Sequence, residues 1–96
     1  MPVAQLTLEL RMEMSHSLKD KRQVVRSLKD KLRHRFNIAV AEVEETELWQ
    51  RATVAAVSVS SSRQYLGGLM REVEEAATKI ARDNGAEVVD TYLEIT

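Results

Sequence analysis

Residues 5–13 read Q-L-T-L-E-L-R-M-E, and apolar and polar side chains alternate along this stretch without a break. Successive side chains of a strand point to opposite sides of a sheet, so alternation with a period of two is typical of a strand that buries one face. The stretch therefore predicts a half-buried first strand whose leucines face a core. The rest of the chain must supply the other side of that core.

A helix is expected directly after this strand. Ser17 is a favourable N-cap, and Asp20 three residues later makes a variant of the capping box. The apolar side chains that follow recur at helical spacing and, at about 100° per residue, fall within an arc of about 120°. They are Leu18, Val24, Val25, Leu28, Leu32 and Phe36. Such an arc is typical of a helix that lies on a sheet, and Asn37 is its expected C-cap.

Three more strands and a second helix are predicted after that point. The segments 38–43 and 53–59 read as strands, and the uncharged second one is expected in the middle of the sheet because both its faces tolerate burial. Serines at 60–62 precede a helix that ends at Asn84 and Gly85. Residues 86–95 form the last strand, with Val89, Leu93 and Ile95 expected on one side and Tyr92 on the other. Gly67 and Gly68 lower the helix propensity of the second helix, which indicates a close backbone approach or a ragged start.

The order of elements is thus β-α-β-β-α-β, which predicts an α+β, ferredoxin-like sandwich over a single domain, 1–96. In this motif a four-stranded antiparallel sheet carries both helices on one face. The strand order 4-1-3-2 is expected by analogy with the motif.

Composition excludes several classes of protein. The 96 residues contain no Cys, so disulfide scaffolds and thiolate metal sites are excluded. The longest uncharged stretch, 52–62, is far shorter than the roughly 20 residues that span a bilayer, so no membrane span is expected. No signal peptide is evident, and a cytoplasmic protein is the simplest interpretation.

The formal net charge of −1 conceals a separation of charge. Residues 19–35 hold eight basic and two acidic residues, a net charge of +6, which leaves −7 for the remainder. Five of these cations follow spacings of three and four and lie on one helix face with no acidic residue among them. We call Lys19, Arg22, Arg26, Lys29 and Arg33 the cationic stripe. The stripe is the candidate nucleic-acid-binding site, since repelling neighbours become favourable when phosphates lie along them.

Two interpretations of the stripe stay open. It binds a polyanion such as structured RNA, or it is solvated or paired internally, for example with the acidic residues Glu42, Glu44, Glu45 and Glu47. RNA recognition through stacking on the sheet is disfavoured, because the exposed side of the first strand carries no aromatic residue. The motif S-L-K-D-K occurs at 17–21 and again at 27–31, and the ten-residue offset turns the two copies toward different directions.

Catalysis has weak support, and an enzyme is not the favoured class. His16 and His34 are the only imidazoles and lie 18 residues apart in sequence, so neither a metal site nor a nucleophile–base pair is indicated. No cofactor is expected, because no phosphate-binding glycine loop is present. The Gly-rich loop that an acylphosphatase would carry after its first strand is also missing.

Two aromatic residues are candidates for an interface. Trp49 either plugs one end of the core or anchors a partner, and Tyr92 lies on the predicted exposed face of the sheet. That face, with Val88 beside Tyr92, is a candidate surface for a homo-oligomer.

Three segments resemble the YlxP-like family of small bacterial proteins of unknown function. They are S-L-K-D-K-R-Q-V-V-R-S-L at 17–28, R-H-R-F-N-I-A-V-A-E-V at 33–43 and L-W-Q-R-A at 48–52. The resemblance implies a ferredoxin-like fold, a bacterial cytoplasmic protein and, from the genes that often adjoin such family members, a part in translation or ribosome maturation. It implies no catalytic residues.

The leading hypothesis is therefore a non-enzymatic accessory factor that binds structured RNA or a ribosomal particle through the cationic stripe. The alternative is a homodimeric interaction or structural module with no nucleic-acid ligand.

Overall fold

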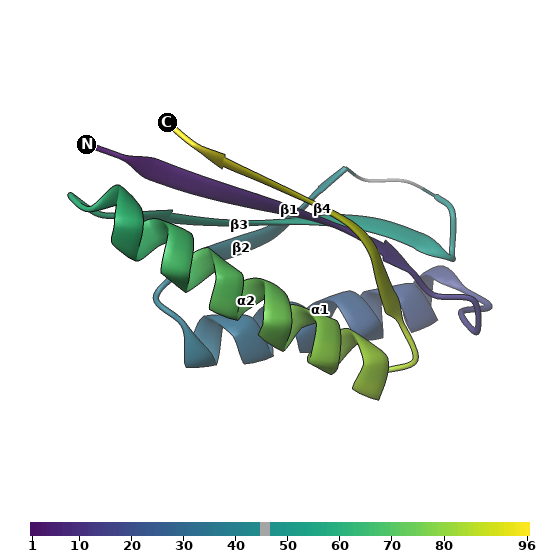
Figure 1. Ribbon diagram of the computed structural model, residues 1–96. Coiled ribbons are helices and arrows are strands. Elements are labelled where there is room, and N and C mark those ends of the chain that lie inside the picture. The colour runs from purple at the N-terminus through teal and green to yellow at the C-terminus, as the bar shows by residue number, and fades with distance from the viewer. Residues whose placement is uncertain (45–46) are drawn as a thin grey trace.

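The elements follow one another in the predicted order (Figure 1). This computed structural model describes residues 1–44 and 47–96. The elements are β1 (Val3–Arg11), α1 (Leu18–Arg35), β2 (Ala39–Glu44), β3 (Arg51–Val59), α2 (Arg63–Asp83) and β4 (Glu87–Ile95). Their ends differ from the predicted ends by one or two residues, which is the ordinary scatter of element boundaries.

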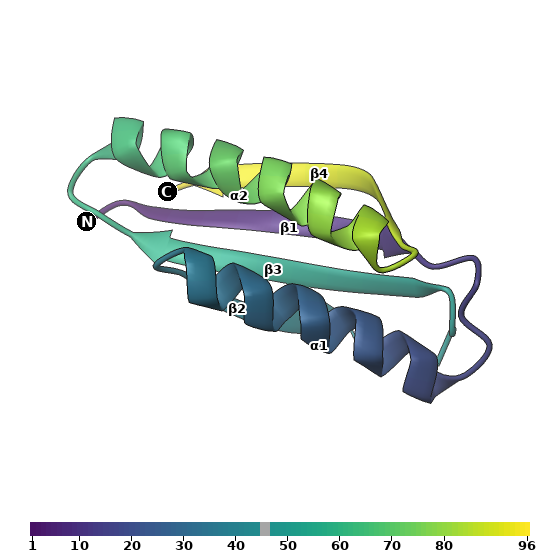
Figure 2. The same ribbon diagram turned by 90° about the horizontal axis from the view of Figure 1, so that it is seen from below.

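The strands form one antiparallel sheet in the order β2-β3-β1-β4, as expected by analogy (Figure 1). Both helices lie on the same face of this sheet: α1 packs beneath β2 and β3, and α2 packs beneath β1 and β4 (Figure 2). The architecture is the predicted ferredoxin-like sandwich. We call the side of the sheet turned away from the two helices the open face.

The core lies between the sheet and the two helices. Leu6, Leu8 and Leu10 of β1 are at most 1% exposed, which confirms the prediction from their alternation. The same buried cluster contains Val25, Leu28 and Leu32 of α1 and Leu66, Met70 and Val73 of α2. β3 is buried along most of its length, as expected for a central strand.

The predicted alternation of the last strand is wrong at Val89. β4 carries a bulge there, because Leu10 pairs with Val88 while its neighbour Glu9 pairs with Asp90. The extra residue shifts the alternation by one, so Val88 packs against the core and Val89 is exposed. Val88 therefore does not belong to the open face, where it was expected beside Tyr92.

Hydrogen bonds at the start of α1 confirm the predicted cap. The Ser17 hydroxyl accepts from the backbone N–H of Asp20 at 3.1 Å, and the Asp20 carboxylate accepts from the backbone N–H of His16 at 3.0 Å. The C-cap is Phe36 and not Asn37. The helix ends one residue early because Phe36 adopts extended backbone and packs its ring against the core.

α2 begins at its N-cap Ser62 and ends as predicted at Asn84 and Gly85, the latter with a φ of 76°. The N–H of Ala86 donates to the carbonyl of Ala81 at 2.8 Å, and the N–H of Gly85 donates to that of Arg82 at 3.2 Å. These two bonds make a Schellman motif, in which glycine accepts the left-handed position without strain.

Gly67 and Gly68 have neither of the explanations offered from the sequence. A methyl group added at either position would meet no atom beyond the local helix backbone within 4 Å, so no close approach requires a glycine. The helix also starts regularly, since the Ser62 hydroxyl accepts from the N–H of Tyr65 at 3.1 Å. Nothing in the structure explains these two glycines.

Neither of the two helices is both long enough and apolar enough to cross a bilayer. The first and last strands are neighbours, and Val3 and Thr96 exchange two backbone hydrogen bonds of 2.9 Å. Both ends of the described chain therefore lie at the same end of the sheet (Figure 1).

Candidate nucleic-acid interface

The cationic stripe lies on the outer flank of α1. Two other sides of this helix are occupied: Lys21, Val25, Leu28 and Leu32 are buried toward the sheet, and Lys31 and Arg35 line a hollow with Ile80 of α2. At about 100° per residue, the centre of the stripe lies about 110° from the sheet-facing side and about 180° from the side that faces α2. The stripe therefore points away from α2, beneath β2, which is an edge strand of the sheet.

Four of the five stripe residues are exposed, and Lys29 is half-buried. Arg33 forms an ion pair with Asp30, one turn earlier on the helix. Within residues 1–44 and 47–96, the other four stripe cations form no ion pair. Internal pairing thus accounts for one stripe residue, and like charges at spacings of three and four leave the other four repelling one another.

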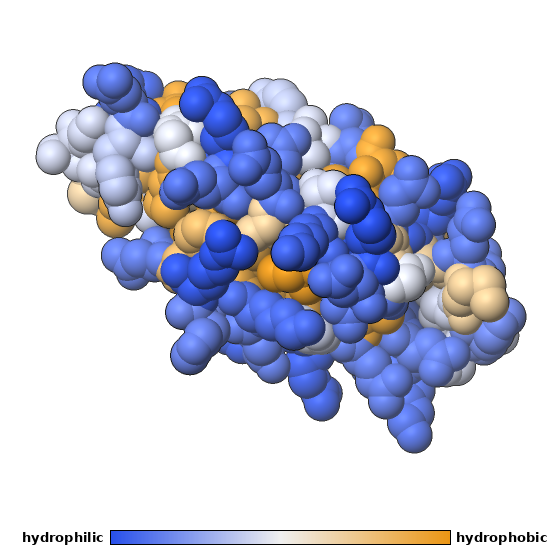
Figure 3. All heavy atoms as spheres, turned by 60° about the horizontal axis from the view of Figure 1, so that its bottom comes forward, coloured by the Kyte–Doolittle hydropathy of each residue, from blue (hydrophilic) through white to orange (hydrophobic). Residues whose placement is uncertain are grey.

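The acidic residues do not neutralise the stripe in the part of the chain that the structure describes. Glu42 pairs with Lys21 at 3.5 Å and so faces the core side of α1. Glu44 and Glu47 are exposed and form no ion pair with the stripe, and Glu45 lies outside the described residues. Figure 3 shows the helix layer, where hydrophilic side chains cover most of both helices and apolar residues are visible between them.

Lys21 has a role that the sequence reasoning missed. Its side chain is only 4% exposed, and its ammonium group lies 3.5 Å from the Glu42 carboxylate and 3.3 Å from the carbonyl oxygen of Leu48. Lys31, the matching residue of the second S-L-K-D-K copy, is exposed. The signal was available in the helical wheel, where Lys21 falls between Leu28 and Leu32 inside the apolar arc.

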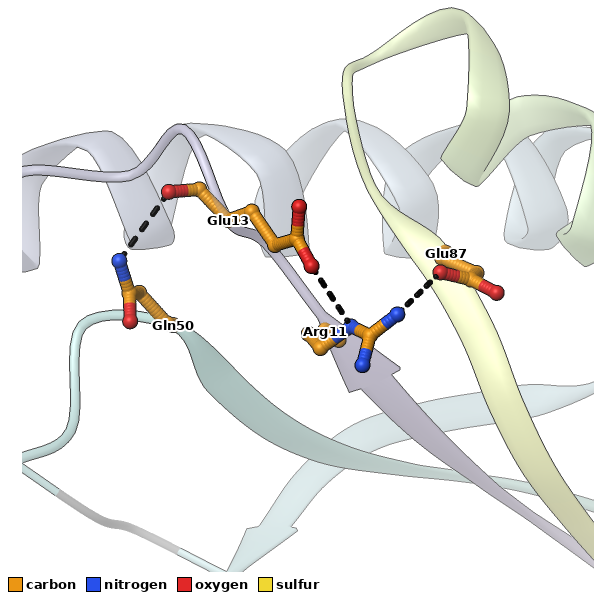
Figure 4. Close-up of polar contacts among 4 residues, drawn as sticks. All are labelled: Arg11, Glu13, Gln50 and Glu87. Atoms are coloured by element: carbon orange, nitrogen blue, oxygen red, sulfur yellow. Dashed lines mark hydrogen bonds and ion pairs between the residues drawn. The ribbon is translucent and has the colours of Figure 1, made fainter.

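Trp49 does not plug the core, because it is 51% exposed. It lines a shallow hollow together with Arg11 and Arg51 at one end of the sheet. The segment before β3 is tied to the segment after β1: the N–H of Met12 donates to the carbonyl of Gln50 at 2.9 Å, and the Gln50 amide donates to the carbonyl of Glu13 at 3.1 Å (Figure 4). Trp49 is therefore presented to solvent on a braced segment.

Tyr92 lies on the open face, as expected, and is 64% exposed. It pairs with Thr7 of β1, which in turn pairs with Ala55 of β3. Arg51, close to Trp49 in the sequence, is the first residue of β3 and pairs with Arg11, the last residue of β1, four residues along from the Thr7–Ala55 pair. The structure thus leaves Trp49 and Tyr92 well separated along the sheet.

Within residues 1–44 and 47–96, no three His, Asp or Glu side chains lie together in a group that could hold a metal ion. His16 lies before the N-terminus of α1, and His34 lies in its last turn, so the fold does not bring the two imidazoles together.

The fold and the exposed basic helix define a ferredoxin-like α+β protein that carries a stripe of positive charge on one flank of its first helix. Residues 3–93 match the family described as "Protein of unknown function (DUF503)", and the chain belongs to this family. The uncharacterized protein YlxP of Bacillus subtilis (strain 168) is 36% identical over 47 residues, which are 49% of this chain and 51% of that protein. The chain therefore spans about half the length of this curated relative.

Solved structures with little sequence identity share the fold. The de novo designed protein LFR1 1, with a ferredoxin fold, has a TM-score of 0.54 and 9% identity, covering 100% of this chain and 84% of that one. A dimeric protein of unknown function with a ferredoxin-like fold from Bacteroides fragilis NCTC 9343 has a TM-score of 0.53 and 13% identity, covering 99% and 94%. These similarities confirm the fold class.

Proposed function

We propose that this protein is a non-enzymatic accessory factor that binds structured RNA, such as the RNA of a ribosomal particle, through the cationic stripe. One observation carries the proposal: five cations line the outer flank of α1, and only Arg33 has an ion-pair partner among the described residues. Such an arrangement costs stability in the free protein, and phosphates placed along the stripe reverse the sign of that cost. A cytoplasmic location follows from this proposal, because ribosomes lie there.

The proposed contacts go to phosphates and not to bases. The stripe contains no aromatic side chain that would stack an unpaired base, and the open face of β1 presents Gln5, Thr7 and Glu9. Recognition would therefore depend on the shape of a duplex, with little preference for sequence.

Binding should depend steeply on salt. We would measure the affinity for a labelled RNA hairpin by fluorescence anisotropy, and cosedimentation with ribosomal subunits, from about 50 to about 200 mM salt. If all five stripe residues contact phosphates, the slope of log K against log salt is about −4 to −5. A flat salt dependence would contradict the proposal.

Two variants with the same change in charge separate the stripe from net charge alone. Reversing Arg22, Arg26 and Lys29 to Glu should weaken binding at least about 100-fold, since three phosphate contacts are replaced by repulsion. Reversing the exposed α2 residues Arg71, Lys79 and Arg82 to Glu should weaken it far less. Equal losses in the two variants would show that the stripe is not the binding surface.

An interaction module without a nucleic-acid ligand is the second candidate. The apolar residues on the uncovered side of the sheet support it, because Val59 and Tyr92 there are more than half exposed. This candidate replaces the first one if neither the hairpin nor ribosomal subunits bind at the lowest salt concentration.

A further inference from the structure

One half of the open face is built from small apolar residues. Ala41 of β2 pairs with Ala55 of β3, and Ala39 pairs with Val57 one row further along. Val59 at the end of β3 pairs with Val3 of β1. We call Ala39, Ala41, Ala55, Val57 and Val59 the apolar half, and it contains no charged side chain. Neither helix covers it (Figure 1).

Two of the charged residues on the open face, Glu9 and Arg11, already have partners. Glu9 accepts a hydrogen bond from the Thr53 hydroxyl at 2.8 Å. Arg11 lies 2.9 Å from Glu87 and 3.5 Å from Glu13, so its guanidinium is held between two carboxylates (Figure 4). Covering groups that are already paired costs less than covering isolated charges.

We propose that a second copy of this chain covers the open face, so that two sheets stack with their apolar halves in contact and Ala55 near the centre. Small side chains there allow the sheets to approach to the usual distance of about 10 Å. Asp90, Tyr92 and Glu94 of β4 then form the rim, where charged groups keep contact with water.

The area of the face is sufficient for a specific dimer. Four strands about 4.8 Å apart with a rise of about 3.3 Å per residue give a face of roughly 19 by 30 Å. Two such faces bury about 1,100 Å² when they are covered, which is just below the roughly 1,200–2,000 Å² of standard specific complexes and above the roughly 1,000 Å² that a biological interface should exceed. Interfaces of this size are typical of weak, transient complexes, so we expect dimerisation at micromolar concentrations.

Charge opposes association through the strand edges. The free edge of β2 lies above the cationic stripe, so pairing two β2 strands would bring two stripes together. The other free edge of the sheet is formed by β4. This strand is bulged at Val89 and carries Glu87, Asp90 and Glu94. Bulges and like charges both hinder pairing at an edge. The apolar half meets neither obstacle.

Face-to-face stacking turns both helix layers outward and leaves the stripe of each copy accessible. The proposed dimer is therefore independent of RNA binding. Sedimentation velocity between about 0.1 and 100 μM protein, a range that brackets the expected micromolar concentrations, should show a concentration-dependent dimer. A monomer at every concentration would overturn the proposal.

Two substitutions direct the test to the face. Val57→Arg lies on an inner strand, where edge pairing cannot be affected, and should raise the dissociation constant at least about tenfold by burying an unpaired charge. Ala41→Arg lies on the edge strand at an exposed position, so it should fold even if the first variant does not. Gln64→Arg on α2 adds the same charge at an exposed helix position and should leave the dimer unchanged. A dimer that persists in both face variants overturns the proposal.

Cross-linking through introduced thiols gives a second readout, because the chain contains no Cys. Sheets about 10 Å apart are too distant for a direct disulfide, so a short bis-maleimide is the reagent, and at least one of the Ala41→Cys, Ala55→Cys and Val57→Cys variants should form a covalent dimer with it. Gln64→Cys should remain a monomer under denaturing conditions. Cross-linking through position 64 alone would place the interface on the helices and contradict the proposal.

Discussion

The ammonium group of Lys21 donates a hydrogen bond to the carbonyl oxygen of Leu48 at 3.3 Å, although the two residues are 27 positions apart in the sequence. A buried lysine in the first turn of α1 is thus hydrogen-bonded to the segment that precedes β3. Glu42 lies 3.5 Å away and balances the buried charge. This contact ties the start of the basic helix to the segment that presents Trp49.

Replacing Lys21 with Met should lower the free energy of unfolding by about 1–3 kcal/mol, because the substitution removes the hydrogen bond to the Leu48 carbonyl and the ion pair with Glu42. Lys31→Met, at the matching and exposed position of the second S-L-K-D-K copy, should change stability by less than about 0.5 kcal/mol. Urea unfolding followed by circular dichroism measures both values. Similar stabilities for the two variants would show that the buried contact contributes nothing.

The same pair of motif copies provides a control for the helix cap. Ser17→Ala removes the acceptor for the Asp20 N–H and should destabilise the protein by about 1 kcal/mol. Ser27→Ala, in the middle of the helix, should cost nothing, since alanine has the higher helix propensity. Thermal unfolding of the two variants checks the difference, and a loss at Ser27 as large as that at Ser17 would exclude a capping effect.

Gly67→Ala and Gly68→Ala should each raise the free energy of unfolding by about 0.5–1 kcal/mol. Both positions are helical, and an added methyl group meets no atom beyond the local backbone within 4 Å, so only the helix propensity changes. Gly85→Ala should have the opposite effect and cost about 1 kcal/mol, because φ at this residue is 76°. Urea unfolding midpoints that fall for the first two variants would reveal a constraint on the helix that its surroundings do not show.

Arg26→Glu should stabilise the protein while it weakens RNA binding. The substitution turns two repelling contacts on the helix, with Arg22 and Lys29, into attractive ones. It also turns the attractive contact with Asp30, four residues further on, into a repelling one, so the net gain should be about 0.5–1 kcal/mol. Arg71→Glu on α2 should destabilise the protein by a similar amount, since Glu74 and Glu75 lie three and four residues away. Urea unfolding and RNA anisotropy on the same samples test both parts. If stability rises and RNA affinity stays the same, the stripe is only a solvated surface.

Much of the fold was predictable from local patterns. The leucines of β1 recur every second residue, and the apolar residues of α1 recur every third or fourth, so each element carries a signal for the face that it buries. Ser17, Ser62 and Gly85 mark helix ends through bonds to residues close in the sequence. The direction of the stripe followed from the same periodicity.

The errors lie where contacts between distant segments decide the outcome. The bulge at Val89 depends on how β4 pairs with β1, which alternation within β4 alone does not reveal. Burial of Lys21 depends on Glu42 and Leu48, which lie beyond the end of the helix. The exposure of Trp49 depends on the hydrogen bonds that brace its segment against the residues after β1. The sequence shows none of these partners beside the residue that they affect.

The paired backbone hydrogen bonds between Val3 and Thr96 hold the two ends side by side, so the chain can be joined there and opened at another loop. A short linker between the two ends would close the backbone into a ring and turn β4 and β1 into an ordinary hairpin. Reopening the ring between β3 and α2 would give a circular permutant that begins with α2 and ends with β3, with every strand pair of the sheet retained.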